Sequence, residues 1–181
     1  MAGTRNAATL GTRKPDSRST AAGGAVSGLA PADKAPAFRL ALDTGENVSL
    51  ASLKGQPFVL YFYPRDDTPG CTREALDFSA AQKKFDRLGV KVIGVSKDSL
   101  ESHEKFRRKH KLTVALGSDP ETSAALAWGV WGEKTLYGRK FMGMERATFL
   151  VDAGGRIVQA WRKVKVPGHV EAVLDAAKAL L

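Results

Sequence analysis

The amino-acid sequence predicts an α/β fold in which a central mixed β-sheet is flanked by helices. The first observation is "PFVLYFY" at residues 57–63, a continuous apolar and aromatic run typical of a strand that is covered on both faces. The second is the alternation of such apolar runs with segments of helical period as far as residue 128. The third is the end of the chain, where two strand patterns joined by the turn "AGG" precede a helix. Together these patterns favour a mixed sheet between helices.

Each element follows from its local pattern. Residues 29–56 form short β-like pieces around the turn signal "DTG" at 43–45. After the strand over 57–63, apolar residues recur at helical spacing over 73–88 and stop at Gly89, which predicts a helix. The remaining predicted elements are a strand over 90–96, a polar helix over 100–110, a strand over 114–116, a helix over 121–128, strands over 146–152 and 156–164, and a helix from 169.

Two glycine-containing segments, "GVWGEK" and "GRKFMGM", do not follow a strand at the spacing of a phosphate-binding loop, so we predict ordinary loops there. The three histidines, His103, His110 and His169, have no carboxylate or cysteine at metal-ligand spacing. The sequence therefore predicts neither a nucleotide site nor a metal site.

Composition indicates one globular domain, because the chain has 181 residues, of which 43% are hydrophobic and 26% charged. No run approaches the ~18 to 20 apolar residues that cross a bilayer, and the N-terminus lacks the apolar region of a secretory signal. A single cysteine cannot form an internal disulfide. We therefore expect a protein of the reducing cytoplasm with no membrane partner.

The first 28 residues are rich in Ala, Gly, Ser and Thr and show no hydrophobic period, so we predict a disordered basic tail ahead of one domain over residues 29–181. The tail's arginines and hydroxyl residues also fit an organellar transit peptide, and that alternative stays open.

The formal net charge of the chain is +9, and four basic residues against one acidic residue place +3 of it in the tail. The rest is diffuse, and its densest run, "KFRRKHK" at 105–111, lies on a predicted helix without a helix-turn-helix pattern. We expect a solvated helix face and no nucleic-acid partner.

The only cysteine, Cys71, follows the buried strand and the turn residues Pro64, Pro69 and Gly70. A lone cysteine is commonly a small buried hydrophobe. Here it enters the first turn of a helix, where free backbone N–H groups and the positive end of the dipole stabilise an anion. The position therefore favours a reactive thiolate.

Thioredoxin-like proteins place a pair of cysteines at this strand-to-helix corner, and here the first of the pair is replaced by Thr68. The stretch "FYPRDDTPGCTRE" resembles the peroxidatic motif of peroxiredoxins. Residues 129–152, "GVWGEKTLYGRKFMGMERATFLVD", resemble the bacterioferritin comigratory protein or peroxiredoxin Q subfamily. The resemblance covers residues 29–181 and implies a thioredoxin-like fold. It also implies a thiol peroxidase that reduces hydrogen peroxide and organic hydroperoxides without a metal or organic cofactor.

The resemblance implies roles for individual residues. Cys71 would be the peroxidatic nucleophile, Thr68 would hydrogen-bond the peroxide, and Pro64 would shield the thiolate from water. Arg146 would stabilise both the thiolate and the charge that develops on the departing oxygen. Glu74 would either orient Arg146 or be an exposed first-turn carboxylate. For Thr68 and Arg146, a plain helix cap and a surface cation are the alternatives.

The sequence departs from the subfamily at Leu76, where many members carry a resolving cysteine five residues after the first. A sulfenic acid on Cys71 would then need an external thiol from thioredoxin, from glutaredoxin with glutathione, or from a second copy of the chain. We expect Leu76 on the apolar face of its helix, and a monomer or weak homodimer. The alternatives are a redox-inactive thioredoxin-fold binding module and a glutathione-dependent oxidoreductase; Pro64 and Thr68 disfavour the second.

Overall fold

A computed structural model describes residues 28–181 of the chain, and the predicted tail therefore lies almost wholly outside the described residues. The elements are β1 (Arg39–Leu42), β2 (Asn47–Ser49), β3 (Phe58–Phe62), α1 (Pro69–Arg87), β4 (Lys91–Ser96), α2 (Leu100–His110), β5 (Ala115–Ser118), α3 (Ser123–Ala127), β6 (Trp131–Leu136), β7 (Arg139–Met144), β8 (Ala147–Val151), β9 (Ile157–Trp161) and α4 (His169–Lys178). None of the helices in this part of the chain is long and apolar enough to cross a membrane.

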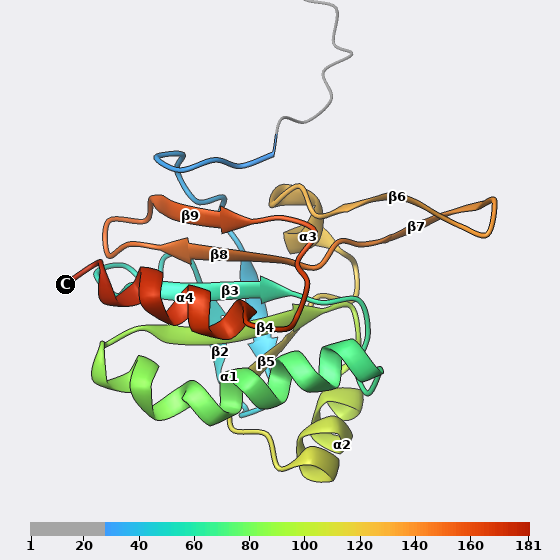
Figure 1. The fold of residues 1–181 in the computed structure, drawn as a ribbon, viewed down its shortest axis with the longest axis horizontal. Helices are drawn as coiled ribbons and strands as arrows, with labels where there is room; N and C mark the ends of the chain where they lie inside the picture. The colour runs from blue at the N-terminus through green and yellow to red at the C-terminus, as the bar shows by residue number, and fades with distance from the viewer. Residues whose placement is uncertain (1–27) are drawn as a thin grey trace, which may run out of the picture.

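Seven strands form one mixed sheet in the order β2-β1-β5-β4-β3-β8-β9 (Figure 1). Apolar side chains from alternate positions of β3 enter two separate cores. One core lies against α3, and the other lies against α1, α2 and α4. The prediction of a central mixed sheet flanked by helices is confirmed, and the continuous apolar run at 57–63 is explained because every residue of β3 is buried.

The pairing of β3 brings together two segments that are far apart in sequence. β3 runs parallel to β4 and antiparallel to β8, with Phe62 opposite Ala147. The end of β3 and the start of β8 therefore lie side by side. As a result, Arg146, which precedes β8, lies next to the loop that leads from β3 into α1.

Helix α1 begins at Pro69, four residues before the apolar period that starts at 73, and Cys71 lies in its first turn as predicted. Thr68 is its N-cap residue in extended conformation, and the Thr72 amide donates to the Thr68 carbonyl at 2.8 Å. Proline suits the first helical position because its missing N–H would have no intrahelical partner there. By contrast, the helix predicted over 121–128 is shorter in the structure, where α3 covers only Ser123–Ala127.

The prediction of loops for the two glycine-containing segments is wrong, because they form the hairpin β6–β7. Tyr137 and Gly138 both have positive φ, at 50° and 75°, which is the conformation of a tight two-residue hairpin turn. The hairpin extends away from the main sheet (Figure 1), and most of its residues are exposed or half-buried. Because the hairpin buries so few side chains, its two strands form without the alternation of apolar and polar residues by which a half-buried strand is predicted.

The expectation that Leu76 packs on the apolar face of its helix is also wrong, since its exposed fraction is 39%. The buried stripe of α1 consists of Cys71, Glu74, Ala75, Phe78 and Phe85. A helix turns about 100° per residue, so residue 76 lies beyond the edge of that stripe. Glu74 lies within this buried stripe although it carries a carboxyl group.

Candidate active site

Cys71 lies in the first turn of α1 with 1% of its surface exposed, packed in the core that faces α1 and α4. The Arg146 Nη2 donates to its Sγ at 3.3 Å. The positive end of the α1 dipole and the guanidinium thus act on one sulfur atom. Both place positive charge beside Sγ.

Arg146 uses the two branches of its guanidinium for different partners. Nη1 donates to Glu74 Oε1 at 2.8 Å, while Nη2 reaches the sulfur. Glu74 is fully buried, with 0% of its surface exposed, so an exposed first-turn carboxylate does not describe it. The carboxylate therefore fixes the direction in which the guanidinium points, and a forked donor is suited to this because its geometry is rigid.

Burial raises the pKa of Glu74 to about 7, although the charge and the hydrogen bond of Arg146 oppose the shift. Glu74 Oε2 has no hydrogen-bond partner among the described residues. For Arg146, burial lowers the pKa, but the charges of Glu74 and Cys71 outweigh it and the pKa is raised. The guanidinium therefore remains a permanent cation beside the sulfur.

Gly70 makes this approach possible. A Cβ atom at this position would lie 3.1 Å from Arg146 Nη2, which is a very close contact. The sequence pattern marks Gly70 only as a turn residue. In the structure its missing side chain also leaves room for the guanidinium.

Thr68 and Pro64 lie on the loop between β3 and α1, and both are half-buried. The Thr68 hydroxyl makes no cap hydrogen bond to α1 and instead donates to the Arg65 carbonyl at 2.9 Å. This bond orients the hydroxyl oxygen as an acceptor. Thr68 thus presents an acceptor oxygen on this loop, and Arg146 presents a donor at the sulfur.

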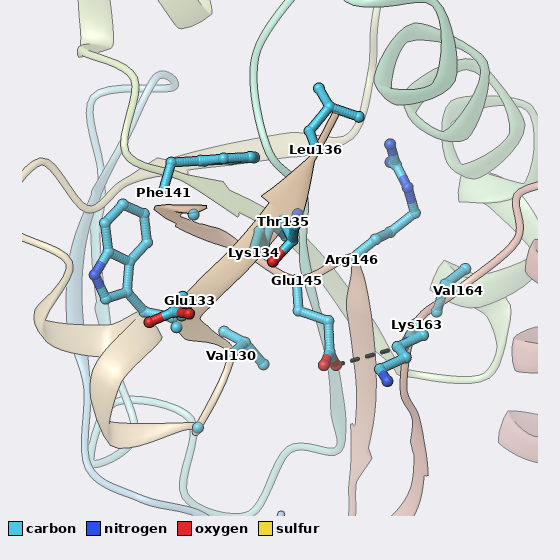
Figure 2. A pocket seen from close by; sticks show the side chains of 14 residues that line it. Val130, Glu133, Lys134, Thr135, Leu136, Phe141, Glu145, Arg146, Lys163 and Val164 are labelled. Atoms are coloured by element: carbon cyan, nitrogen blue, oxygen red, sulfur yellow. Dashed lines mark hydrogen bonds between the residues drawn. The ribbon is translucent and has the colours of Figure 1, made fainter. Parts of the chain in front are cut away.

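A pocket of about 710 Å³ opens beside Arg146 (Figure 2). Figure 2 shows its residues coming from the β6–β7 hairpin, from Glu145 and Arg146 just before β8, and from the segment that carries Lys163 and Val164. Burial lowers the pKa of Lys134 in this pocket, and the charge of Arg146 lowers it further. The pocket includes both apolar and charged side chains: Val130, Glu133, Lys134, Leu136, Phe141, Glu145, Lys163 and Val164.

The structure shows a second buried pair of charged side chains, Asp66 and His103, which the sequence does not predict. Asp66, on the same loop as Thr68, is buried and lies 2.7 Å from His103 of α2, measured from Oδ2 to Nδ1. The two residues are 37 positions apart. Nothing in a single sequence marks such a pair, because no local pattern links Asp66 of the Cys71 motif to a histidine on a later helix. Within residues 28–181 there is no cluster of three or more His, Cys, Asp or Glu side chains suited to a metal ion.

Comparison with known proteins agrees with this arrangement. The chain matches the AhpC/TSA family over residues 31–160. It is 49% identical over 145 residues to Peroxiredoxin Bcp of Bacillus subtilis, covering 80% of this chain and 92% of the relative. It is 48% identical over 140 residues to Peroxiredoxin Bcp of Xanthomonas campestris, covering 77% and 88%.

Solved structures show the same relationship. Peroxiredoxin Q of Xanthomonas campestris superposes with a TM-score of 0.75 at 47% identity, covering 78% of this chain and 90% of that one. A mutant of PrxQ from Xylella fastidiosa superposes with a TM-score of 0.79 at 40% identity, covering 84% and 98%. These neighbours have the thioredoxin-like fold, as the sequence predicted. The chain therefore belongs to the AhpC/TSA family, as a thiol-dependent peroxidase of the Bcp or Q type of peroxiredoxin.

Proposed function

We propose that this chain reduces hydrogen peroxide and organic hydroperoxides at Cys71 and that an external thiol regenerates it. The observation that carries the proposal is the contact of 3.3 Å between Arg146 Nη2 and a sulfur buried at the start of α1. A thiolate held there has a fixed donor beside it. The same donor can act on a second atom that approaches the sulfur.

In the first step the thiolate attacks one oxygen of the O–O bond. An S–O bond forms, the O–O bond breaks, and the leaving oxygen departs as water or an alcohol after taking up a proton. Arg146 donates to the charge that develops on the oxygens, and Thr68 accepts the hydrogen bond of the peroxide hydroxyl. A preorganised donor of this kind contributes on the order of a hundredfold or more to such a step. Pro64 shields the thiolate from bulk water.

In the second step the sulfenic acid on Cys71 condenses with an external thiol, and water leaves as a mixed disulfide forms. A second thiol then releases Cys71 by exchange. The support is the sequence itself, because Cys71 is the only cysteine and Leu76 stands five residues after it. Thioredoxin, or glutaredoxin with glutathione, has the required chemistry, and a reducing cytoplasm supplies both. We propose a monomer or weak homodimer that needs no metal and no organic cofactor.

The test uses the full chain with and without Cys71→Ser. One equivalent of hydrogen peroxide is expected to raise the intact mass by one oxygen, and a sulfenic-acid probe is expected to label Cys71 alone. Normal peroxide turnover by folded Cys71→Ser would refute the mechanism. Comparing peroxide consumption with disulfide exchange in one preparation separates a peroxidase from a glutathione-dependent oxidoreductase. Absence of both reactions would leave a redox-inactive binding module.

A further inference from the structure

The loop between β3 and α1, residues 64–70, carries Pro64 and Thr68 and is here named the catalytic loop. Within it Asp66 is the only buried residue, with 8% of its surface exposed. Other hydrogen bonds of this loop, from Thr68 to the Arg65 carbonyl and from Lys109 to Asp67, lie at exposed positions. Asp66 is therefore the one buried anchor of the loop.

The Asp66 carboxylate accepts three hydrogen bonds. The Tyr63 hydroxyl donates to Oδ1 at 2.6 Å, while the Ser102 hydroxyl and His103 Nδ1 donate to Oδ2 at 2.9 Å and 2.7 Å. The Asp66 backbone amide donates in turn to Asp98 Oδ2 at 2.8 Å. Both the side chain and the backbone of this one residue are thus tied to the body of the protein.

His103 has 0% of its surface exposed, and both of its ring nitrogens face acceptors. Nδ1 faces Asp66, and Nε2 lies 3.0 Å from the Gly117 carbonyl of β5. A histidine that donates from both nitrogens is an imidazolium cation. Burial lowers the pKa of His103, but the hydrogen bond and the charge of Asp66 outweigh it, and the pKa is raised.

We propose that Asp66 and His103 are positioning residues for peroxide reduction, because their buried ion pair holds the catalytic loop so that Thr68 and Pro64 stay in place beside Cys71. Asp66 stands two residues after Pro64 and two before Thr68. His103 is itself anchored by α2 and by β5, so the loop is tied to two rigid elements. This inference rests on the proposed peroxidase function of the same site.

The test compares two reactions of the same sulfur. Oxidation by hydrogen peroxide needs the thiolate together with the positioned loop, whereas alkylation by iodoacetamide needs only a reachable thiolate. In Asp66→Asn and His103→Gln we expect the second-order rate constant for hydrogen peroxide to fall by about tenfold or more, as small misplacements of reacting groups do. The alkylation rate is expected to stay the same or rise.

The matched control is Asp43→Asn. The Asp43 side chain is also fully buried and also binds a cation of α2, since Arg107 Nη2 donates to its Oδ1 at 2.9 Å. It anchors α2 to the turn after β1, not to the catalytic loop. We expect a similar fall in melting temperature but both rate constants within about twofold of the wild type. A fall in the peroxide rate equal to that of Asp66→Asn would overturn the proposal.

Tyr63→Phe serves if the charge variants do not fold, because it removes only the hydroxyl that donates to Asp66. It is expected to slow the peroxide reaction about threefold with unchanged alkylation. Equal peroxide rates in this variant and the wild type would refute the positioning role. A wild-type chain that does not react with hydrogen peroxide would instead refute the proposed function. The two failures are therefore distinguishable.

A spectroscopic readout adds to the rates. The groups that face His103 are Asp66 on the catalytic loop, Tyr63 after β3 and the Gly117 carbonyl, while the Ser102 hydroxyl of α2 donates to the same Asp66 oxygen. The carboxylate of Asp98 lies farther along the same network and raises the His103 pKa further. We expect both ring N–H protons of His103 to be visible by NMR in the wild type at a pH just above the ordinary imidazole pKa of about 6.5, and lost in Asp66→Asn. A neutral His103 at pH 7 in the wild type would contradict the ion pair.

Discussion

Two buried carboxylates face cations close to Cys71, and hydrogen bonds satisfy them to different degrees. Both oxygens of Asp66 accept hydrogen bonds, three in all. Glu74 binds Arg146 through Oε1, while Oε2 has no partner among the described residues. A fully satisfied buried carboxylate makes its surroundings rigid, whereas a partly satisfied one is held at a cost in free energy.

This difference matches the location of the two pairs. Asp66 and His103 do not touch the sulfur, and they connect a loop to the body of the protein. Glu74 and Arg146 form part of the site, because the same guanidinium that binds Glu74 donates to Cys71. The fully satisfied pair Asp66–His103 therefore holds the catalytic loop, whereas the partly satisfied pair Glu74–Arg146 lies at the reactive sulfur.

The largest effect is expected from Arg146→Ala, which removes the cation from the reactive pair. The variant should reduce hydrogen peroxide about a hundredfold more slowly, as expected for the loss of one transition-state donor. Stopped-flow kinetics measure this rate. Wild-type rates in a folded variant would remove Arg146 from the site.

Glu74→Gln tests whether the partly satisfied carboxylate carries an energetic cost. We expect peroxide reduction to slow by about tenfold, because Arg146 loses the charge that orients it. The folded-state pKa of Glu74 is raised to about 7, so the folded protein binds this proton more strongly than the unfolded chain. Its contribution to the free energy of unfolding therefore falls as pH rises from about 4.5 to about 7, by on the order of 3 kcal/mol.

Urea unfolding at several pH values measures this contribution. The wild type should lose stability across the window relative to Glu74→Gln. Asp86→Asn is the control, since Asp86 lies on the same helix, is exposed and accepts a hydrogen bond from Gln82. Parallel stability curves for the wild type and Glu74→Gln would mean that the Glu74 carboxyl titrates alike in the folded and unfolded chains.

Leu76→Cys tests whether the reactive side can open. In an intact helix, residues 71 and 76 are separated by about 7.5 Å along the axis, beyond the ~7 Å that a disulfide spans. The first turn of α1 must therefore unwind, and helix ends open most readily. After peroxide treatment we expect a disulfide between Cys71 and the introduced thiol, and less overoxidation than in the parent. Peptide mapping identifies the product, and finding only free or sulfinic Cys71 would mean that the turn stays closed.

The stability cost of Leu76→Cys should be small. Leu76 has an exposed fraction of 39%, so the substitution should cost about 0.5 kcal/mol or less, in place of the larger loss expected for a core leucine. Chemical denaturation of the reduced variant measures this value. A loss above about 2 kcal/mol would place Leu76 in the core after all.

The smallest effect is expected from Asp67→Asn, the neighbour of Asp66. Asp67 is exposed and binds Lys109 and His110, each at 2.7 Å, and these contacts lower its pKa. Ion pairs at the surface contribute little, and asparagine tolerates the positive φ of 58° at this position. Hydrogen peroxide should react within about twofold of the wild-type rate. A loss as large as that of Asp66→Asn would show that exposed contacts hold the loop as well.

The sequence by itself determined the elements whose signals are local. The apolar run of β3, the helical period of α1 and the motif around Cys71 each lie within a few residues, and burial or dipole effects act over that range. From them, together with the second motif over residues 129–152, came the α/β class, the position of the thiol at a helix start and the resemblance that named Arg146 and Glu74. These predictions needed no knowledge of which segments meet.

Only the tertiary structure decided the features that depend on packing between distant segments. The pairing of β3 with β8 brings Arg146 to within 3.3 Å of Cys71, and the packing of α2 places His103 against Asp66. Leu76 is exposed and Glu74 is buried because the elements packed against α1 determine which of its faces is buried. The hairpin β6–β7 is stabilised by its turn and not by an apolar face. Periodicity reports how often apolar residues recur, but burial and ion pairing depend on which surfaces meet in three dimensions.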